Sequence, residues 1–352
     1  MATIKDIAKA AGVSIGTVSR ALNNGKGMTQ ETRERILSIS KRLNYQPNLQ
    51  ARGLVGGKPN ALGIVIPRVH EIVFSNPFFA EILIGIGKKA RKAGQYLVFS
   101  IASNESYTQM FHQRLVAGII VLGNRIDDPW VEEAWQSKVP IVLIPGNPSP
   151  SNIPSVDFDN IDGAFQAVDY LAKIGHRRIA FLYGPGNLKF GIDRLVGFRK
   201  ALKKNGIPNQ KDLVWEFDAT QQGGYKAMKD LLLLDPPPTA VLVLNDFSAM
   251  GVLRAAKESG FQVPRDVSIV GFGDVPLAAM TDPPLTTVRE PFHEMGYEAC
   301  ERLLKIIQGK RLPQKHLILP VELVIRKTTA PPSQQGSPEH ISEKEVSFHG
   351  LE

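Results

Sequence analysis

From Ala61 onward the chain alternates short apolar runs with amphipathic segments of helical length. The strand-like runs include ALGIVI, QYLVFSIA, GIIVLG, PIVLI, RIAFLYG, TAVLVL and VSIVGF, with segments such as FFAEILIGIGKKARKAG and GAFQAVDYLAKIG between them. This alternation predicts an α/β fold with parallel sheets, because a parallel strand pair needs a crossover that is usually helical. The region from Ala61 onward is long enough for two such sheets, so we expect a two-lobed body.

The positive charge of the chain is concentrated before this region. The whole chain carries a formal net charge of +8, and residues 1–60 hold ten Lys or Arg against three acidic residues, a net charge of +7. The remainder is nearly neutral. Such an asymmetry indicates that the first sixty residues meet a polyanion, although a solvated basic face would look the same.

Within the basic region the pattern predicts a helix-turn-helix. Thr3 can cap a helix that Gly12 ends, and Ser14 can cap a second helix over residues 15–22. Two helices joined by a tight turn that contains glycine form this motif. A third helix is predicted at about residues 30–43, where apolar residues recur on one face.

The next segment, NLQARGL at residues 48–54, begins with a capping Asn and continues in a helical pattern. Seven residues that include a glycine cannot hold a helix alone in water, because helix nucleation is costly. We therefore expect either a conditional helix or a linker.

The segments TIKDIAKAAGVSIGTVSRALN and YQPNLQARGL resemble the head and hinge of the lactose/galactose repressor (LacI/GalR) family of bacterial transcription regulators. The resemblance covers roughly residues 3–332. It implies a lambda-repressor-like helix-turn-helix head, a hinge helix and a periplasmic-binding-protein-like body. In that family the second helix enters the major groove, and paired hinge helices insert leucines into the minor groove. Leu54 occupies the position that matches this leucine.

The resemblance also implies the domain boundaries. The N-lobe and the C-lobe are expected to be discontinuous, because the family's chain crosses back through both. The expected parts are a DNA-binding domain at 1–47, a hinge at 48–60, an effector-binding and dimerisation domain at 61–330 (N-lobe about 61–160 plus 291–319, C-lobe about 161–290 plus 320–330) and a disordered tail at 331–352.

In the second helix, the positions that reach bases in the family match Ile15, Gly16 and Arg20. Gly16 has no side chain to read a base edge, so discrimination should fall on Arg20, suited to guanine, and on Ile15, suited to a thymine methyl. Core packing is the alternative role for Ile15. The residues expected to contact DNA are Thr3, Lys5, Ser14, Ile15, Gly16, Thr17, Ser19, Arg20, Thr29, Tyr45, Asn48, Ala51, Arg52 and Leu54.

A small ligand is expected between the lobes, because ligands of open α/β sheets bind at the carboxyl ends of strands. Arg194 matches an arginine that family members use to hold ligand oxygens, and Phe79, after a loop over residues 68–75, is a stacking candidate. Stapling of the next helix is the alternative for Phe78 and Phe79, helix capping is the alternative for Asp159, and a surface ion pair is the alternative for Arg194. The effector-binding candidates are Phe78, Phe79, Asp159, Arg194, Phe217, Asp246 and Asp274.

Three positions depart from the family pattern. Gly273 replaces a common aspartate, Pro145 stands where an aspartate is common, and Ala219 aligns with an aromatic that often closes the pocket. These departures predict a reshaped pocket, so the ligand cannot be copied from relatives.

Enzyme chemistry finds no support in the sequence. Residues 186–191 have the spacing of a phosphate loop but are followed by Ile-Asp instead of Lys-Ser/Thr, and no GxSxG elbow is present. The single cysteine excludes a disulfide within the chain and a cysteine zinc cluster. We expect no catalytic residues, no metal and no cofactor. Without a signal peptide or a long apolar run, we expect a cytoplasmic, nucleoid-associated bacterial protein that contacts no membrane.

The sequence thus predicts a regulator, with repression the family's usual mode, whose affinity for operator DNA depends on a small molecule such as a sugar. Dimerisation would give a twofold axis and hence a pseudo-palindromic double-stranded operator. Two alternatives stay open: a DNA-binding protein whose body only dimerises, and a solute-binding receptor, which would need a secretory signal. The sign of the ligand's effect also stays open.

Overall fold

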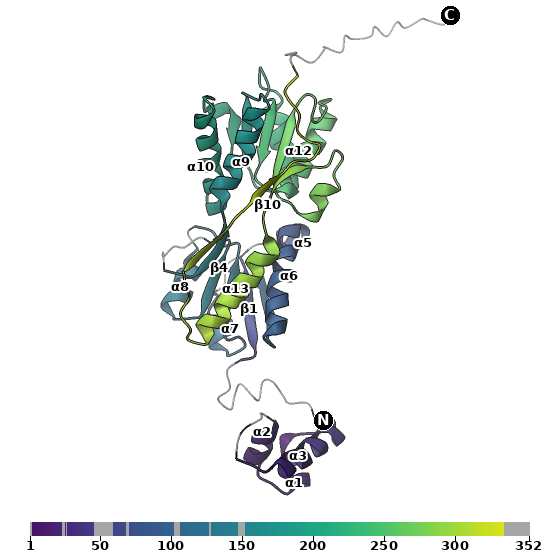
Figure 1. Cartoon of the computed structure of the whole chain (residues 1–352), viewed down its shortest axis with the longest axis vertical. Coiled ribbons are helices and arrows are strands. Elements are labelled where there is room, and N and C mark those ends of the chain that lie inside the picture. The colour runs from purple at the N-terminus through teal and green to yellow at the C-terminus, as the bar shows by residue number, and fades with distance from the viewer. Residues whose placement is uncertain are drawn as a thin grey trace, which may run out of the picture. The chain divides into compact units, whose positions relative to one another are not determined.

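The computed structural model describes residues 2–22, 25, 27–45, 59–67, 70–101, 106–126, 128–146 and 152–333. The chain divides into two compact units, Met1–Asn60 and Ala61–Glu352, called here the head and the body (Figure 1). The expected hinge contacts Asn48, Ala51, Arg52 and Leu54 lie outside the described residues.

The head consists of α1 (Ile4–Ala11), α2 (Ile15–Leu22) and α3 (Gln30–Arg42). Thr3 and Asp6 form a reciprocal capping box at the start of α1, which satisfies backbone donors that a helix end leaves free. One face of each helix contributes to a small common core that contains Ile7, Val18 and Ile36. Gly12, with φ 66°, makes the turn between α1 and α2.

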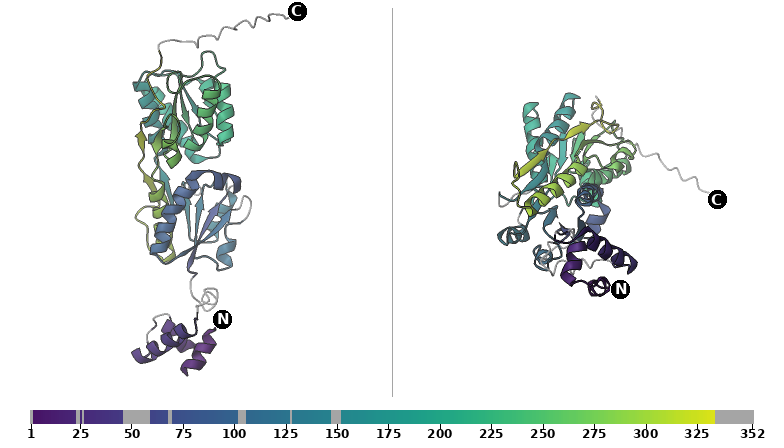
Figure 2. Two further views of the ribbon diagram at one scale, coloured as in Figure 1. Left: turned by 90° about the vertical axis from the view of Figure 1, so that its right-hand side faces the viewer. Right: turned by 60° about the horizontal axis from the view of Figure 1, so that its bottom comes forward.

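The body contains two six-stranded sheets, one in each lobe (Figures 1 and 2). The sheet of lobe 1 has the order β11-β5-β4-β3-β1-β2, and every pair in it is parallel. Its strands are β1 (Ala61–Ile66), β2 (Tyr96–Ile101), β3 (Ile119–Leu122), β4 (Ile141–Ile144), β5 (Ser155–Phe158) and β11 (His316–Leu319).

The sheet of lobe 2 has the order β12-β10-β9-β8-β6-β7. It is parallel except for β12, which pairs antiparallel with β10 at one edge. Its strands are β6 (Ile179–Leu182), β7 (Val214–Trp215), β8 (Ala240–Val243), β9 (Ser268–Gly273), β10 (Thr286–Arg289) and β12 (Glu322–Val324). The central strands are buried from end to end, as expected of a parallel sheet covered on both faces.

Helices cover the faces of both sheets. One close crossing joins α6 to α13, where a Cβ added to Gly85 would lie 2.0 Å from the carbonyl oxygen of His293, so only glycine fits. The body helices are α5 (His70–Ser75), α6 (Pro77–Lys92), α7 (Gln109–His112), α8 (Pro129–Gln136), α9 (Asn160–Lys173), α10 (Lys189–Lys204), α11 (Gln221–Leu231), α12 (Asp246–Glu258) and α13 (Phe292–Ile307), with 3-10 turns at Lys211–Leu213 and Pro276–Ala279.

Residues 70–75 form α5, where the sequence pattern predicted a loop, so that expectation was wrong. Val73 is 6% exposed and belongs to the main apolar cluster of the body. A single buried side chain of this kind stabilises a short helix through tertiary packing that periodicity does not reveal.

The chain passes between the lobes after β5, after β10 and after β11. Consequently α13 packs in lobe 1 against α6 and β4, although it follows the strands of lobe 2. Each lobe is therefore assembled from segments far apart in the sequence, and the crossing segments run side by side between them (Figure 1).

Candidate functional sites

One face of α2 is open to solvent in the head. Val18 and Ala21 point into the core, whereas Ile15 is 45% exposed. Arg20 is also exposed, and its Nε donates to the carbonyl oxygen of Gly16 at 3.4 Å. Ile15 is therefore a surface residue of the head and not part of its core, so α2 presents one apolar and one cationic side chain on its outer face.

The other predicted DNA contacts of the head lie at helix ends or on its surface. Ser14 accepts from the backbone N–H of Thr17 at 3.1 Å, and Thr29 accepts from that of Thr32 at 3.2 Å. Lys5 is exposed on α1, while Tyr45 packs partly against the core. In the described part of the head, the side chains of Thr3, Ser14 and Thr29 therefore accept hydrogen bonds at the starts of helices. Ser19 is half-buried on α2.

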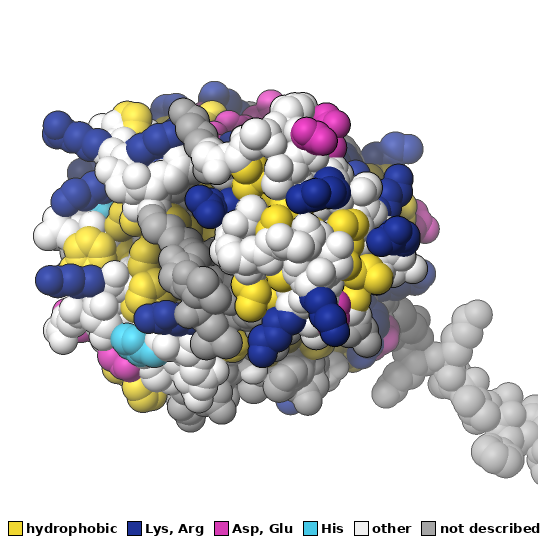
Figure 3. Space-filling model, turned by 90° about the horizontal axis from the view of Figure 1, so that it is seen from below, with side chains coloured by type: hydrophobic (Ala, Val, Ile, Leu, Met, Phe, Trp, Pro, Cys, Tyr) yellow, Lys and Arg dark blue, Asp and Glu magenta, His cyan; other side chains and the backbone are white. Residues whose placement is uncertain are grey.

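Exposed cations outnumber exposed acids on the described head. Figure 3 shows Lys and Arg side chains spread over the visible face of the protein, with few acidic ones among them. In the head the exposed residues of this kind are Lys5, Lys9, Arg20, Arg35, Lys41 and Arg42. A surface of this charge attracts the phosphate backbone of DNA without regard to sequence.

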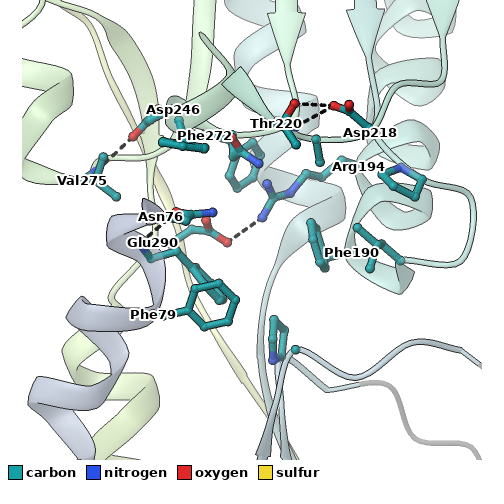
Figure 4. A pocket seen from close by; sticks show the side chains of 18 of the residues that line it. Asn76, Phe79, Phe190, Arg194, Asp218, Thr220, Asp246, Phe272, Val275 and Glu290 are labelled. Atoms are coloured by element: carbon teal, nitrogen blue, oxygen red, sulfur yellow. Dashed lines mark hydrogen bonds and ion pairs between the residues drawn. The ribbon is translucent and has the colours of Figure 1, made fainter. Parts of the chain in front are cut away.

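The body contains a cavity of about 370 Å³ between its lobes (Figure 4). Gly123 and Pro145 reach it from the ends of β3 and β4 in lobe 1, and Asn245 reaches it from the end of β8 in lobe 2. These positions follow the carboxyl ends of parallel strands, where open α/β sheets bind their ligands.

Phenylalanine rings make much of the cavity wall. Phe292, at the crossing into α13, meets Phe78 edge-on with ring centroids 5.4 Å apart and Phe158 edge-on at 5.7 Å. The aromatic wall therefore joins α6, β5 and α13. The phenylalanines that line the cavity are Phe78, Phe79, Phe158, Phe190, Phe247, Phe272 and Phe292.

Arg194 projects from α10 into the cavity, where its guanidinium is held from several sides. Its Nε donates to Oδ1 of Asn160 at 2.8 Å, and its Nη2 donates to Oε1 of Glu290 at 2.7 Å. Nη1 donates to the carbonyl oxygen of Leu244. The guanidinium carbon lies 3.5 Å from the ring centroid of Phe272. The arginine is thus immobilised before any ligand arrives.

Three buried carboxyl groups surround this single guanidinium. Burial raises the pKa of Glu290 to about 7 and that of Asp246 to about 6. Burial likewise raises the pKa of Asp157, whose Oδ1 accepts from Asn160, to about 8. The charge of Arg194 opposes the shift at Glu290 and Asp157 without cancelling it. The deep part of the cavity therefore holds more acid than base.

A hydrogen bond links the two lobes next to a residue of the cavity lining. The N–H of Ile126, in the loop after β3, donates to the carbonyl oxygen of Asn187 at 3.1 Å. Ile126 belongs to lobe 1, and Asn187 follows β6 in lobe 2. This contact joins the two lobes directly, in addition to the covalent crossings.

Comparison with known proteins places this geometry in a family. Residues 3–48 match the family described as bacterial regulatory proteins, lacI family, and residues 168–329 match the periplasmic binding protein-like domain. The chain is 34% identical over 335 residues to the HTH-type transcriptional repressor CytR of Escherichia coli K12, covering 93% of this chain and 96% of CytR. The chain belongs to the lacI family.

Further relatives agree. The HTH-type transcriptional regulator DegA of Bacillus subtilis is 34% identical over 337 residues, covering 94% of this chain and 98% of DegA. The crystal structure of the lac repressor dimer bound to operator and the anti-inducer ONPF matches with a TM-score of 0.81 and 32% identity over 94% of this chain and 99% of that chain. The transcriptional regulator CelR-cellobiose complex matches with a TM-score of 0.70 and 31% identity over 93% of this chain and 100% of that chain. The predicted α/β fold and the predicted family are confirmed, and the protein is a DNA-binding transcription regulator.

Of the predicted effector contacts in this lacI-family chain, Phe78, Phe79, Arg194 and Asp246 line the cavity. Asp246 is 1% exposed and already accepts from the hydroxyl of Thr287 at 2.6 Å and from the N–H of Val275 at 3.0 Å. Both of its oxygens are therefore engaged in fastening the start of α12 to the strands beside it.

The remaining candidates lie elsewhere in the structure. Asp159 caps α9 by accepting from the N–H of Asp162 at 2.9 Å, which was its alternative role. Phe217 packs against the second apolar cluster of lobe 2. Asp274 pairs with Arg289 at 2.7 Å and also with Arg326. None of these three predicted side chains lines the cavity in the described structure.

Sequence reasoning missed several polar residues of the cavity. Glu290 and Asn160 each follow a strand, β10 and β5, by one or two residues, so the strand-end rule would have found them. Asp218 and Thr220 stand beside Ala219, one of the departures from the family pattern, in the loop before α11. The cavity residues that were not predicted include Asn76, Asn160, Asn187, Phe190, Asp218, Thr220, Phe272 and Glu290.

The departures from the family pattern gather at the cavity. Pro145 and Ala219 both line it. Gly273 has φ 132°, and a Cβ there would lie 3.3 Å from both Oδ2 of Asp246 and the ring of Phe292. A side chain at this position would require its neighbours to shift, so the local packing is adapted to glycine.

Among the described residues, no helix is long and apolar enough to cross a membrane. The same part of the chain contains no cluster of three or more His, Cys, Asp or Glu arranged to hold a metal ion.

Proposed function

We propose that this regulator is a repressor whose operator affinity is set by a small molecule, a sugar or related metabolite, bound between the lobes of the body. The observation that carries the proposal is the interlobe cavity. Its volume of about 370 Å³ lies within the roughly 300–1,000 Å³ typical of small-molecule sites. The related structure of CelR contains cellobiose, which supports a ligand of comparable chemistry here.

The regulator acts as a homodimer on a pseudo-palindromic operator. β2 is one of the two edge strands of the lobe 1 sheet as far as the structure describes it, and its Tyr96 and Phe99 are 60% and 52% exposed. Ile84, on the neighbouring helix α6, is 49% exposed. An apolar edge of this kind can bind a second copy of the chain, because unpaired strand edges and exposed aromatic side chains favour association. The related lac repressor is a dimer on its operator.

Ligand binding changes DNA affinity by shifting the population of closed lobes. A ligand that contacts both walls of the cavity favours the closed arrangement, in which Ile126 and Asn187 already meet. Closure changes the fraction of dimers able to engage both half-sites.

Titration of operator DNA with the full-length protein, with and without candidate ligands, tests this function. Calorimetry against sugars, sugar phosphates and nucleosides identifies a ligand, and fluorescence anisotropy of labelled operator then measures its effect. We expect one ligand to bind and to change operator affinity by a factor of about 5–150, the usual range of allosteric coupling. If no candidate bound and operator affinity never changed, the body would serve only for dimerisation; a ligand that bound without changing operator affinity would refute control by that ligand.

A further inference from the structure

We propose that the interlobe cavity selects a ligand that donates hydrogen bonds and carries no negative charge, and that Glu290 makes this selection. The inference rests on the proposed function and deepens it, because it states which chemical class of metabolite the cavity accepts. It separates neutral and cationic compounds, such as free sugars and amino sugars, from phosphorylated and acidic ones.

The charges of the cavity are distributed unevenly between its mouth and its depth. Arg125 and Asp218 are exposed lining residues of opposite charge. Glu290 and Asp246 are 6% and 1% exposed, and Arg194 is 3% exposed. The deep lining has two carboxyl groups and one guanidinium, while Asp157 lies outside the lining and keeps its proton at neutral pH because burial raises its pKa to about 8. A ligand anion placed there would face the carboxyl groups of Glu290 and Asp246 beside a guanidinium that is already paired, in a medium of low dielectric constant.

The guanidinium of Arg194 is not free to receive an anion. Its Nε, Nη1 and Nη2 donate to Asn160, Leu244 and Glu290, and one face of its plane lies on the ring of Phe272. A ligand phosphate or carboxylate that took Nη2 would leave Glu290 as a buried carboxylate without its partner. Breaking a buried ion pair in this way is strongly unfavourable.

Hydrogen-bond acceptors remain available in the cavity. Glu290 uses Oε1 for Arg194, and its Oε2 accepts no hydrogen bond from the described residues. Asn187, which also lines the cavity, has a buried Oδ1 that no described residue donates to. Because a buried acceptor without a donor costs free energy, Oδ1 of Asn187 favours a ligand that brings hydroxyl or amine donors, and Oε2 of Glu290 can accept a further hydrogen bond.

The aromatic side chains of the cavity wall also favour a ligand without negative charge. Phe79 and Phe190 are drawn on opposite sides of the space below Arg194 in Figure 4, and Glu290 extends toward the same space. Ring faces carry partial negative charge, so they attract cations and C–H groups and repel anions. The wall and the carboxylate therefore present compatible surfaces to an uncharged or positively charged ligand.

Fractionation of a bacterial metabolite extract by charge tests the inference. The extract is passed over an anion-exchange resin at neutral pH, which separates retained anions from neutral and cationic compounds in the flow-through. Each fraction is added to the full-length protein, and thermal unfolding and operator affinity are measured. We expect the flow-through to raise the unfolding temperature and to change operator affinity. Activity in the retained fraction alone would overturn the inference, and activity in neither would overturn ligand control itself.

A matched pair of variants assigns the selection to Glu290. Glu290→Gln keeps the shape of the side chain and removes its charge, whereas Glu294→Gln makes the same change at an exposed position of α13 outside the cavity lining. In Glu290→Gln we expect the half-effective amount of the active flow-through to rise at least about ten-fold, because a hydrogen bond to a charged acceptor is lost. We expect a change below about two-fold in Glu294→Gln. Equal responses of the two variants would contradict the role of Glu290, and the fractionation decides the charge selection even if Glu290→Gln unfolds.

Discussion

Nη2 of Arg194 lies 2.7 Å from Oε1 of Glu290, and both side chains are 4% exposed. Arg194 belongs to α10 of lobe 2, while Glu290 lies in the crossing between β10 and α13. The pair therefore joins lobe 2 to one of the segments that lead into lobe 1. An arginine expected to hold ligand is thus also part of the internal framework of the cavity.

Replacement of Arg194 by Met should destabilise the body by about 3–5 kcal/mol, because it leaves Glu290 without its buried partner. Urea unfolding followed by circular dichroism measures the change. Lys305→Ala is the control, since it breaks the more exposed pair with Glu301 and should cost less than about 1 kcal/mol. Similar costs for the two variants would mean that the buried pair contributes no more than a surface one.

Arg20→Ala and Lys5→Ala should weaken operator binding in different ways. Loss of Arg20 should cost about 1–3 kcal/mol and relax the sequence preference at one position of each half-site. Loss of Lys5 should weaken binding to all sequences alike and reduce the slope of log affinity against log salt by about 1. Both side chains are exposed, so neither change should disturb the core of the head. Binding to a randomised operator library at two salt concentrations distinguishes these outcomes.

Gly16→Ala should stabilise the head by up to about 1 kcal/mol, because alanine is the better helix former. The added Cβ would meet only Oγ of Ser14, at 3.8 Å, so nothing in the described head obstructs it. The same methyl group would lie on the outer face of α2, where it should change the preferred operator sequence. Thermal unfolding of the protein measures the change in stability, and selection from an operator library measures the change in sequence preference. A destabilised head would contradict the open environment of Gly16.

Asp157→Asn should stabilise the protein increasingly as the pH rises from 5 to 8. Burial raises the pKa of Asp157 in the folded state to about 8, so the folded protein holds a proton that the unfolded chain releases near pH 4. The wild-type protein therefore loses stability as the pH rises through this window. Asparagine keeps an oxygen that can accept from the N–H of Phe158 and does not ionise. We expect its advantage in unfolding free energy to grow by more than about 1 kcal/mol, and an advantage independent of pH would refute the assignment.

Local signals explain why the head was predicted closely. The caps Thr3 and Thr29 and the turn at Gly12 bond to residues only a few positions away in the sequence. The predicted third helix ends only one residue beyond α3. The directions of Asp274 and Glu290 depend instead on distant partners. Arg326 lies 52 residues from Asp274, and Arg194 lies 96 residues from Glu290. No periodic pattern encodes such pairs, so the lining of the cavity was predicted only in part.

The placement of β11 at the edge of the lobe 1 sheet bears on how the protein is made. The strand comes from His316–Leu319, whereas its sheet begins at Ala61, and the packing of α13 is likewise supplied late. During synthesis the head can fold once its three helices have left the ribosome, because its core uses no later residues. Lobe 1 can be completed only after almost the whole chain has been synthesised. A nascent regulator therefore has a folded DNA-binding head before it has a completed ligand sensor.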